Sequence, residues 1–336
     1  MSSMNKTLPA ASDVARLAGV SQSAVSRAFT EGASISARTR EKVMAAAQQL
    51  GYRPNQLARS LLKGRSNIVG VALGNLENPF FTQVLDRLSQ RLSAVGQRVL
   101  IFTATANAEV DAELEEMLDY RVDALILMST TLSSSLANQC EDTGIPVIFL
   151  NRTGYLQQCC SVTGDNVNGA RQIAAHLLEC GYQHIAFMAG FQDSSTSSER
   201  EQAFTQYLLS QGKLAPIREV GDFSRQGAME ATRRLLNRPQ RPDAIFCAND
   251  HMALATLDVV RYEFGLIPGQ DIGIAGFDDV SAANWPGNKL TTFSQPVQPM
   301  VDSATEFVLG AGQGSRDQQH VVIPGELIIR DSTCPR

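Results

Sequence analysis

Short apolar runs alternate with longer amphipathic stretches from residue 68 to the end of the chain. Four runs come first, "IVGVAL", "RVLIFT", "DALILM" and "PVIFL", and four follow in the second half, "HIAFM", "IREV", "DAIFC" and "DIGIAGF". Runs rich in β-branched residues, with helical stretches between them, are typical of parallel strands covered by helices on both faces. The pattern therefore predicts two similar α/β halves.

Helical periodicity fills the intervals between these strands. We expect helices near residues 80–95, 109–119, 133–142, 167–180, 198–211, 225–237 and 250–264. Residues 290–297, "LTTFSQPV", indicate a crossing back to the first half, which the last helix and strand then rejoin. The core, 67–336, is predicted to be two doubly wound parallel-sheet lobes. We assign about 67–165 plus 297–325 to the N-lobe, and about 166–296 plus the C-terminal segment to the C-lobe.

The N-terminal residues have the period of helices alone. Ser12 can cap a first helix over 13–18, and Ser21 and Ser36 are good caps for two more. Two short helices joined by a glycine turn are the pattern of a helix-turn-helix. We therefore expect an all-α, DNA-binding headpiece over 8–53.

Charge divides the chain at nearly the same place. The first 65 residues carry ten basic and three acidic residues, whereas the remaining 271 carry 19 and 31, although the whole chain has a net charge of −5. A basic head suits a polyanionic partner, and the acidic remainder must have another role. Together with the helix-turn-helix pattern, the charge indicates a DNA-binding regulator.

Helix-turn-helix proteins read base edges with the first residues of their second helix. Gln22, Ser23 and Arg27 are hydrogen-bonding side chains at such positions, and arginine is the usual partner of guanine. Hydroxyl side chains near helix starts suit phosphate contacts, and the candidates are Ser21, Ser26 and Ser36. The solvated face of an ordinary three-helix domain is the alternative interpretation.

Residues 54–66 predict a hinge helix and linker between the headpiece and the core. A helix of about eight residues is unstable alone in water, so we expect it to order only against DNA or a partner helix. Asn55 lies at its start, and Leu61 is free to act as an apolar wedge in the minor groove. An ordinary interdomain linker is the alternative.

Polar and aromatic residues follow the predicted strands, where ligands bind in folds of this kind. The candidates for an effector site between the lobes are Asn78, Phe80, Phe81, Asn151, Arg152, Arg200, Phe223, Asn249, Asp278 and Gln295. Phenyl rings stack on the apolar faces of a sugar, and polar side chains pair with its hydroxyls. Each residue alone is also typical of a cap or a core position. The set indicates a polyol because all ten fall at one end of the predicted sheets.

The headpiece segments "DVARLAGVSQSAVSR", "ISARTREKVMAAAQQLGYRPN" and "ARSL" resemble those of the LacI/GalR family of bacterial repressors. The segments "NPFF", "TSSER", "ANDHMAL" and "GFDD" are similar to the core of these regulators and of periplasmic ribose-type binding proteins. The resemblance implies a homodimer on a pseudo-palindromic operator, most often a repressor, with the DNA and effector contacts named above. Asn151 stands where aspartate is usual in ribose binders, which favours another sugar or a sugar derivative.

Motifs for nucleotide and acyl-transfer chemistry are absent from the sequence. No G-x-G-x-x-G follows the first strand, and there is no G-x-x-x-x-G-K-[ST] and no G-x-S-x-G. We therefore expect neither an enzyme nor a cofactor. Six cysteines without C-x-x-C spacing and four scattered histidines predict reduced thiols and no metal site.

Two further observations bear on location and on the alternatives. The apolar runs are too short to cross a bilayer and the N-terminus lacks a signal-peptide core, which predicts a cytoplasmic protein. A stand-alone sugar-binding protein is one alternative, which the headpiece disfavours. A regulator with a phosphorylated or nucleobase effector is another, because Arg152 and Arg200 could serve an anion.

Overall fold

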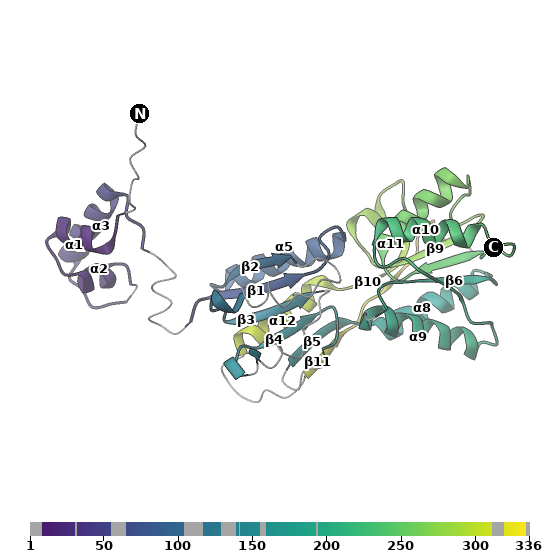
Figure 1. The fold of residues 1–336 in the computed structure, drawn as a ribbon, viewed down its shortest axis with the longest axis horizontal. Coiled ribbons are helices and arrows are strands. Elements are labelled where there is room, and N and C mark those ends of the chain that lie inside the picture. The colour runs from purple at the N-terminus through teal and green to yellow at the C-terminus, as the bar shows by residue number, and fades with distance from the viewer. Residues whose placement is uncertain are drawn as a thin grey trace. The chain divides into compact units, whose positions relative to one another are not determined.

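The computed structural model describes residues 9–30, 32–54, 65–103, 117–128, 139–140, 142–154, 159–192, 194–310 and 319–333. The chain divides into two compact units after Ser66 (Figure 1). Most of the expected hinge helix, including Asn55 and Leu61, lies outside the described residues. So does most of the helices expected near 109–119 and 133–142.

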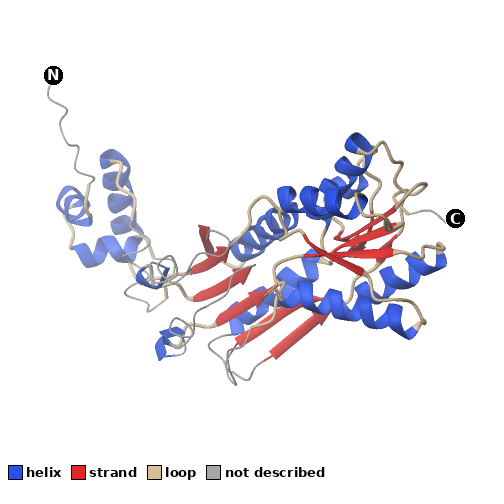
Figure 2. Cartoon of the chain, turned by 45° about the vertical axis from the view of Figure 1, so that its right-hand side comes forward, coloured by secondary structure: helices blue, strands red, loops and turns tan. Residues whose placement is uncertain are grey.

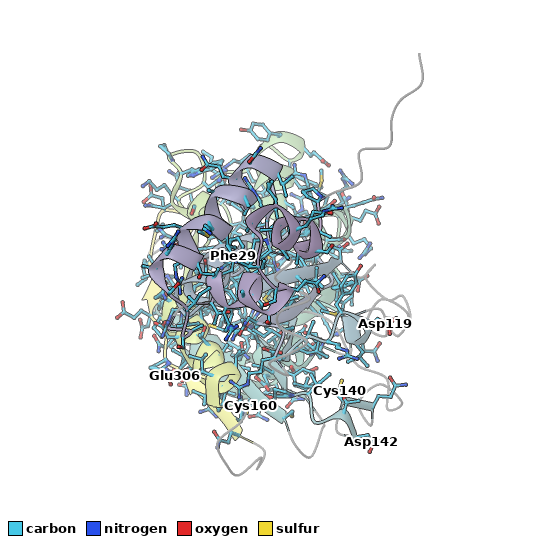
Figure 3. The ribbon with its side chains drawn as sticks, turned by 90° about the vertical axis from the view of Figure 1, so that its left-hand side faces the viewer. Phe29, Asp119, Cys140, Asp142, Cys160 and Glu306 are labelled. Carbon is cyan, nitrogen blue, oxygen red and sulfur yellow. The ribbon has the colours of Figure 1, made fainter. Side chains whose placement is uncertain are left out.

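The described part of the first unit contains three helices, which form the headpiece: α1 (Ala11–Ala18), α2 (Gln22–Ala28) and α3 (Ala37–Leu50). Each contributes a buried valine, Val14, Val25 or Val43, to one apolar cluster. Phe29, labelled in Figure 3, packs edge to face on Tyr52 with ring centroids 5.8 Å apart. The apolar sides of three short helices therefore converge on a single small core.

The caps of α2 and α3 follow the sequence prediction. Ser21 Oγ accepts the Ala24 N–H at 3.2 Å, and Ser36 Oγ accepts the Thr39 N–H at 3.1 Å. Each bond satisfies one of the backbone donors that the first turn of a helix leaves unpaired.

The start of α1 differs from the prediction. The helix begins at Ala11, so Ser12 lies inside it and is not the cap. No side chain caps the first turn, and Asp13 instead reaches back, with its Oδ2 accepting the N–H of Ala10, the residue before the helix, at 2.9 Å. A carboxylate in the first turn also suits the positive end of the helix dipole.

Six parallel strands form the sheet of the N-lobe, in the order β11-β5-β4-β3-β1-β2 (Figure 1). They are β1 (Ile68–Leu73), β2 (Arg98–Thr103), β3 (Ala124–Met128), β4 (Val147–Leu150), β5 (Cys159–Gly164) and β11 (Gln319–Ile323). Among the residues that the structure describes in this lobe, two helices pack on the sheet and on each other, α5 (Pro79–Ala94) and α12 (Val297–Gly310). The end of the chain thus completes the lobe that its beginning starts.

The sequence pattern does not mark β5. Its residues, "CCSVTG", include a single β-branched apolar side chain, so the apolar run typical of the other strands is missing. The strand is nevertheless mostly buried, because it pairs with β4 on one side and with β11 on the other. Neighbouring strands on both sides satisfy its backbone, and small residues then fill the interior position.

The C-lobe sheet has the order β12-β10-β9-β8-β6-β7, in which only β12 runs antiparallel to its neighbour. Its strands are β6 (Ile185–Ala189), β7 (Ile217–Val220), β8 (Ala244–Cys247), β9 (Gly273–Asp278), β10 (Thr291–Ser294) and β12 (Leu327–Ile328). Its helices are α8 (Asn166–Glu179), α9 (Ser195–Ser210), α10 (Arg225–Leu236) and α11 (Asp250–Asp258). Figure 1 shows α8 and α9 on one side of the sheet and α10 and α11 on the other.

The red strands of the two sheets lie in different parts of the core in Figure 2. The predicted fold class, two doubly wound lobes with an all-α headpiece, is therefore confirmed.

The described part of the chain passes between the lobes three times, from β5 to α8, from β10 to α12 and from β11 to β12. The crossing segments pair through their backbones. Asp165 N–H donates to Ile323 O at 3.0 Å, and Ser294 N–H donates to Glu326 O at 2.7 Å. The three crossings therefore lie side by side between the lobes.

Asp250 is fully buried at the start of α11. Its Oδ2 accepts the Val280 N–H at 2.9 Å, and its Oδ1 accepts the Thr292 hydroxyl at 2.6 Å. These bonds tie the turn after β9, and β10, to the helix. A Cβ atom on Gly276 in β9 would overlap Asp250 Oδ1, which is why glycine stands there.

We expect Gly276→Ala to lower the thermal midpoint of the core by a few degrees. The added methyl group pushes against a carboxylate held by two hydrogen bonds, and such overpacking costs about 1–3 kcal/mol. Gly287→Ala is the control, because the Cβ position of Gly287 has open space. Scanning fluorimetry of both variants measures the difference, and equal midpoints would contradict the expectation.

Candidate functional site

Helix α2 of the headpiece has one buried and one exposed side. Ala24, Val25 and Ala28 face the apolar cluster. Four predicted contact residues, Gln22, Ser23, Ser26 and Arg27, are exposed. The helix therefore offers a continuous polar surface, as contact with a DNA groove requires.

The remaining described DNA-contact candidates, Ser21 and Ser36, are exposed and also serve as caps. Ser21 Oγ lies 2.9 Å from Ser23 Oγ, and Ser36 Oγ lies 2.7 Å from Thr39 Oγ1. A capping oxygen that accepts a backbone N–H keeps its own proton, so each hydroxyl pair still has a donor to give.

Arg200, on α9, is the largest buried polar side chain of the core, only 2% exposed. Its Nε donates to Asn166 Oδ1 at 2.9 Å, and its Nη1 donates to Ala248 O at 2.5 Å. The guanidinium carbon lies 3.6 Å from the centroid of the Phe277 ring, and Nη1 lies 3.8 Å from Asp278 Oδ1. Nη2 has no hydrogen-bond partner among the described residues.

Asp278 and Gln295 extend this cluster toward the N-lobe. Gln295 Nε2 donates to Asp278 Oδ1 at 2.7 Å, and both side chains are buried. Gln295 Oε1 has no partner among the described residues and lies beside Gly164, at the end of β5. A Cβ atom on Gly164 would come within 2.5 Å of that oxygen, so the glycine makes room for the Gln295 amide.

Burial shifts the ionisation of the whole cluster. It raises the pKa of Asp278 to about 8, against the attraction of Arg200 and with added repulsion from Asp250. It raises the pKa of Asp250 to about 6 and lowers that of Arg200 to about 10. Arg200 therefore remains a cation at neutral pH, while the Asp278 carboxyl is easily protonated.

Aromatic rings stand at the ends of β6 and β7. Phe191 and Phe223 pack edge to face with centroids 5.7 Å apart. Asn75 Nδ2 of the N-lobe donates to Phe223 O at 3.3 Å, and the Thr153 N–H donates to Ser195 Oγ at 3.1 Å. These two hydrogen bonds join the lobes at the same edge of the sheets.

The other predicted effector residues follow strands at this edge, but their side chains make different kinds of contact. Asn78 and Asn249 cap α5 and α11, with their side-chain oxygens accepting backbone N–H groups at 3.0 Å. Phe80 and Phe81 are buried in the apolar core and pack edge to face, 5.5 Å apart. Asn151 and Arg152 follow β4, where Asn151 Oδ1 is buried without a partner among the described residues. Hydrogen-bonding and ionic contacts thus join Arg200, Asp278 and Gln295, and the other predicted residues follow neighbouring strands.

Several residues of the cluster are not predicted from the sequence as contacts, namely Asn166, Phe277, Asp250, Asn75 and Phe191. Asp250 directly follows Asn249 and Phe277 directly precedes Asp278 in "GFDD", so both had a local signal. The others depend on tertiary packing, which periodicity does not encode.

Backbone strain marks the same edge. Asn151, Asp222, Phe223, Asp278 and Asp279 have φ angles of 62°, 51°, 50°, 130° and 57°. They are five of the eight non-glycine residues with positive φ in the described chain. Such conformations cost roughly 1–3 kcal/mol each and gather at ligand sites, where the surroundings hold them in place.

Within the described residues, no helix is long and apolar enough to cross a membrane. The same residues contain no cluster of His, Cys, Asp and Glu side chains that could hold a metal ion.

A helix-turn-helix headpiece on a two-lobed core, with a buried polar site at the strand ends, defines the class of ligand-responsive DNA-binding regulators. Residues 66–306 match the family of periplasmic binding proteins and sugar binding domains of the LacI family, and residues 11–55 match the bacterial regulatory proteins of the lacI family. The chain belongs to the LacI family and is a DNA-binding transcriptional regulator.

Relatives align along nearly the whole chain. The lactose operon repressor of Escherichia coli (strain K12) is 30% identical over 96% of this chain and 89% of its own length. The regulator CelR of Thermobifida fusca is 29% identical over 95% of this chain and 96% of its own.

Two solved structures have the same fold. The Lac repressor dimer bound to operator and an anti-inducer has a TM-score of 0.85 at 29% identity, covering 97% of this chain and 99% of that one. The CelR–cellobiose complex has a TM-score of 0.72 at 28% identity, covering 96% of this chain and 99% of that one.

The raised pKa of Asp278 predicts a pH-dependent stability of the core. The folded protein holds a proton on Asp278 that the unfolded chain releases, so its contribution is complete below pH 3.8 and is lost as the pH rises to about 8. We expect Asp278→Asn to flatten the fall in thermal midpoint between pH 6 and 8, whatever constant loss the unpaired Arg200 adds. Asp258→Asn, at a surface ion pair, is the control. An unchanged slope in Asp278→Asn would contradict the assignment.

Proposed function

We propose that this protein is a homodimeric repressor whose affinity for a pseudo-palindromic operator is controlled by a small carbohydrate bound between the two lobes. The observation that carries the proposal is the buried network of Arg200, Asp278 and Gln295, with open hydrogen-bonding atoms, in a chain of the LacI family. The CelR relative was solved with cellobiose, which supports a sugar as the class of effector.

The chemistry of the open atoms favours a neutral sugar. Arg200 Nη2 offers a donor, whereas Gln295 Oε1 and Asn151 Oδ1 offer acceptors. A sugar hydroxyl both donates and accepts, so it can pair with either kind. A phosphate has only acceptors at its ionised oxygens, which cannot pair with the open oxygens of Gln295 and Asn151. These features support an unphosphorylated effector over the phosphorylated and nucleobase alternatives.

Coupling between effector and operator then follows from lobe rotation. The hydrogen bonds from Asn75 to Phe223 and from Thr153 to Ser195 cross between the lobes beside the site. A sugar that contacts both lobes changes their preferred angle, and the headpiece linker leads directly into β1 of the N-lobe. Linkage requires that operator and effector change each other's affinity by the same factor, typically ~5–150-fold. The effector is an inducer if that factor is unfavourable and a corepressor if it is favourable.

At the DNA end, Gln22, Ser23 and Arg27 are proposed to contact bases from α2. The hydroxyls of Ser21, Ser26 and Ser36 would contact phosphates and set the register. Asn55 and Leu61 would act in the hinge, with Leu61 as a minor-groove wedge.

A thermal-shift screen of the full chain against pentoses, hexoses, disaccharides, sugar acids and sugar phosphates tests the effector class. A sugar at 100 times its dissociation constant is expected to stabilise the core by about 2.7 kcal/mol, a shift of a few degrees. Arg200→Met should abolish this shift, while Arg234→Met, at a surface ion pair with Glu219, should keep it. A response to sugar phosphates or purines alone would refute the neutral sugar and leave the regulator intact.

Arg27→Ala is expected to cost about 1–3 kcal/mol on a duplex selected from a random pool by the wild-type protein, and to relax the choice at one base pair. Arg16→Ala, on the exposed side of α1, removes the same charge away from α2 and serves as the control. Binding to selected and scrambled duplexes measures both effects. An equal loss on the two duplexes would make Arg27 a phosphate contact.

A further inference from the structure

Helix α2 has only seven residues, too few for a helix to be stable alone in water. Its start is fixed by the Ser21 cap, and its middle by Val25 in the apolar cluster. Arg27 lies in its last turn, where a helix leaves backbone carbonyls without partners. Its Nε donates to Ser23 O at 3.4 Å, one turn earlier, so the position of Arg27 depends on α2 keeping its helical backbone to the end.

Ala28 lies in the apolar cluster and Phe29 packs on Tyr52, while Arg40 of α3 pairs with the carbonyls at the end of α2. Its Nη1 donates to Ala28 O at 2.8 Å, and its Nη2 donates to Thr30 O at 3.4 Å. The side chain is half-buried, and the two carbonyls belong to the last residue of α2 and to the turn after it. A planar guanidinium can bridge two carbonyls in this way, whereas an ammonium group acts as a point charge.

The position of Arg40 in its own helix supports this role. It lies in the first turns of α3, where the helix dipole disfavours a cation. At the end of α2 the dipole has the opposite sign, so the charge is favourable where the guanidinium lies. The Thr30 hydroxyl adds a second contact to the same end, donating to Ser26 O at 2.9 Å.

We infer that Arg40 is a positioning residue for sequence-specific DNA recognition, which fixes the end of α2 and with it Arg27, and is not itself a DNA contact. The inference rests on the proposed base contact of Arg27 and extends it to the residue that aims it. A basic side chain on a DNA-binding domain is ordinarily taken as a phosphate contact, so the two roles must be separated by experiment.

Arg38 provides a matched control. It lies two residues earlier on α3, is exposed, and makes no side-chain hydrogen bond or ion pair within the described headpiece. Arg38→Met and Arg40→Met remove the same charge from the same helix, but only the second removes the two hydrogen bonds to the carbonyls at the end of α2. Arg40→Lys keeps the charge and removes the fork, that is, the planar guanidinium that bridges the two carbonyls.

The experiment measures the affinity of the full chain for two duplexes over a range of salt concentrations. One duplex is selected from a random pool by the wild-type protein, and the other is its scrambled sequence. We expect Arg40→Lys to lose about tenfold on the selected duplex, the size of one lost base contact, with its scrambled-duplex affinity and salt slope unchanged. We expect Arg38→Met to change the two affinities by the same factor.

Hydrogen exchange gives a second, independent readout. Peptides that cover 22–30 are expected to exchange faster in both Arg40 variants than in Arg38→Met, because α2 loses its support at one end. If Arg40→Met fails to fold, scrambled-duplex binding is lost as well, and Arg40→Lys decides the question.

Any of three results would overturn the inference. If Arg40→Met weakens both duplexes equally and lowers the salt slope by about one, Arg40 is a phosphate contact. If Arg40→Lys keeps full affinity for the selected duplex, the fork is not needed. A loss confined to Arg27→Ala, with all Arg40 variants like wild type, would keep the base contact and remove only the positioning role.

Discussion

The burial of one cation organises the effector end of the molecule. Removing a guanidinium from water is expensive unless its hydrogen bonds and charge are replaced, and the surroundings of Arg200 supply both. Asn166 comes from α8, the Ala248 carbonyl follows β8, and Phe277 and Asp278 come from β9. Meeting the needs of this side chain therefore fixes three elements of the C-lobe relative to one another. The atoms left open are those that a ligand can use.

The headpiece is stabilised in a different way, because its apolar core is too small to fix the recognition surface by packing alone. Its interior is a small apolar cluster, and single hydrogen bonds define where each helix begins and ends. Specificity in such a domain rests on a few exposed side chains, and the backbone that carries them determines their positions. Side chains that never approach DNA can thus influence which sequence is bound, as the contacts of Arg40 with the end of α2 illustrate.

Sequence patterns predicted the fold well where burial leaves a simple trace. Strands such as β1 and β3 are apolar throughout and were predicted. Strand β5 was not predicted, because small and polar residues form a strand that its neighbours bury. For the candidate site, the sequence predicted where the residues lie better than what their side chains do. Asn78 and Asn249 follow strands as ligand-binding residues do, yet their oxygens cap helices, a use that sequence does not distinguish. Phe277 belongs to the site because the Arg200 guanidinium stacks on its ring.

The three crossings between the lobes limit how those lobes can move. Segments that lie side by side and share backbone hydrogen bonds resist sliding and separation, but they bend together easily about the line that joins them. We therefore infer that the easiest motion of the core is a change in the angle between the lobes. A receptor of this design responds to its ligand only through the angle between the lobes. Ligands of different shape and chemistry therefore have the same effect if they favour the same angle.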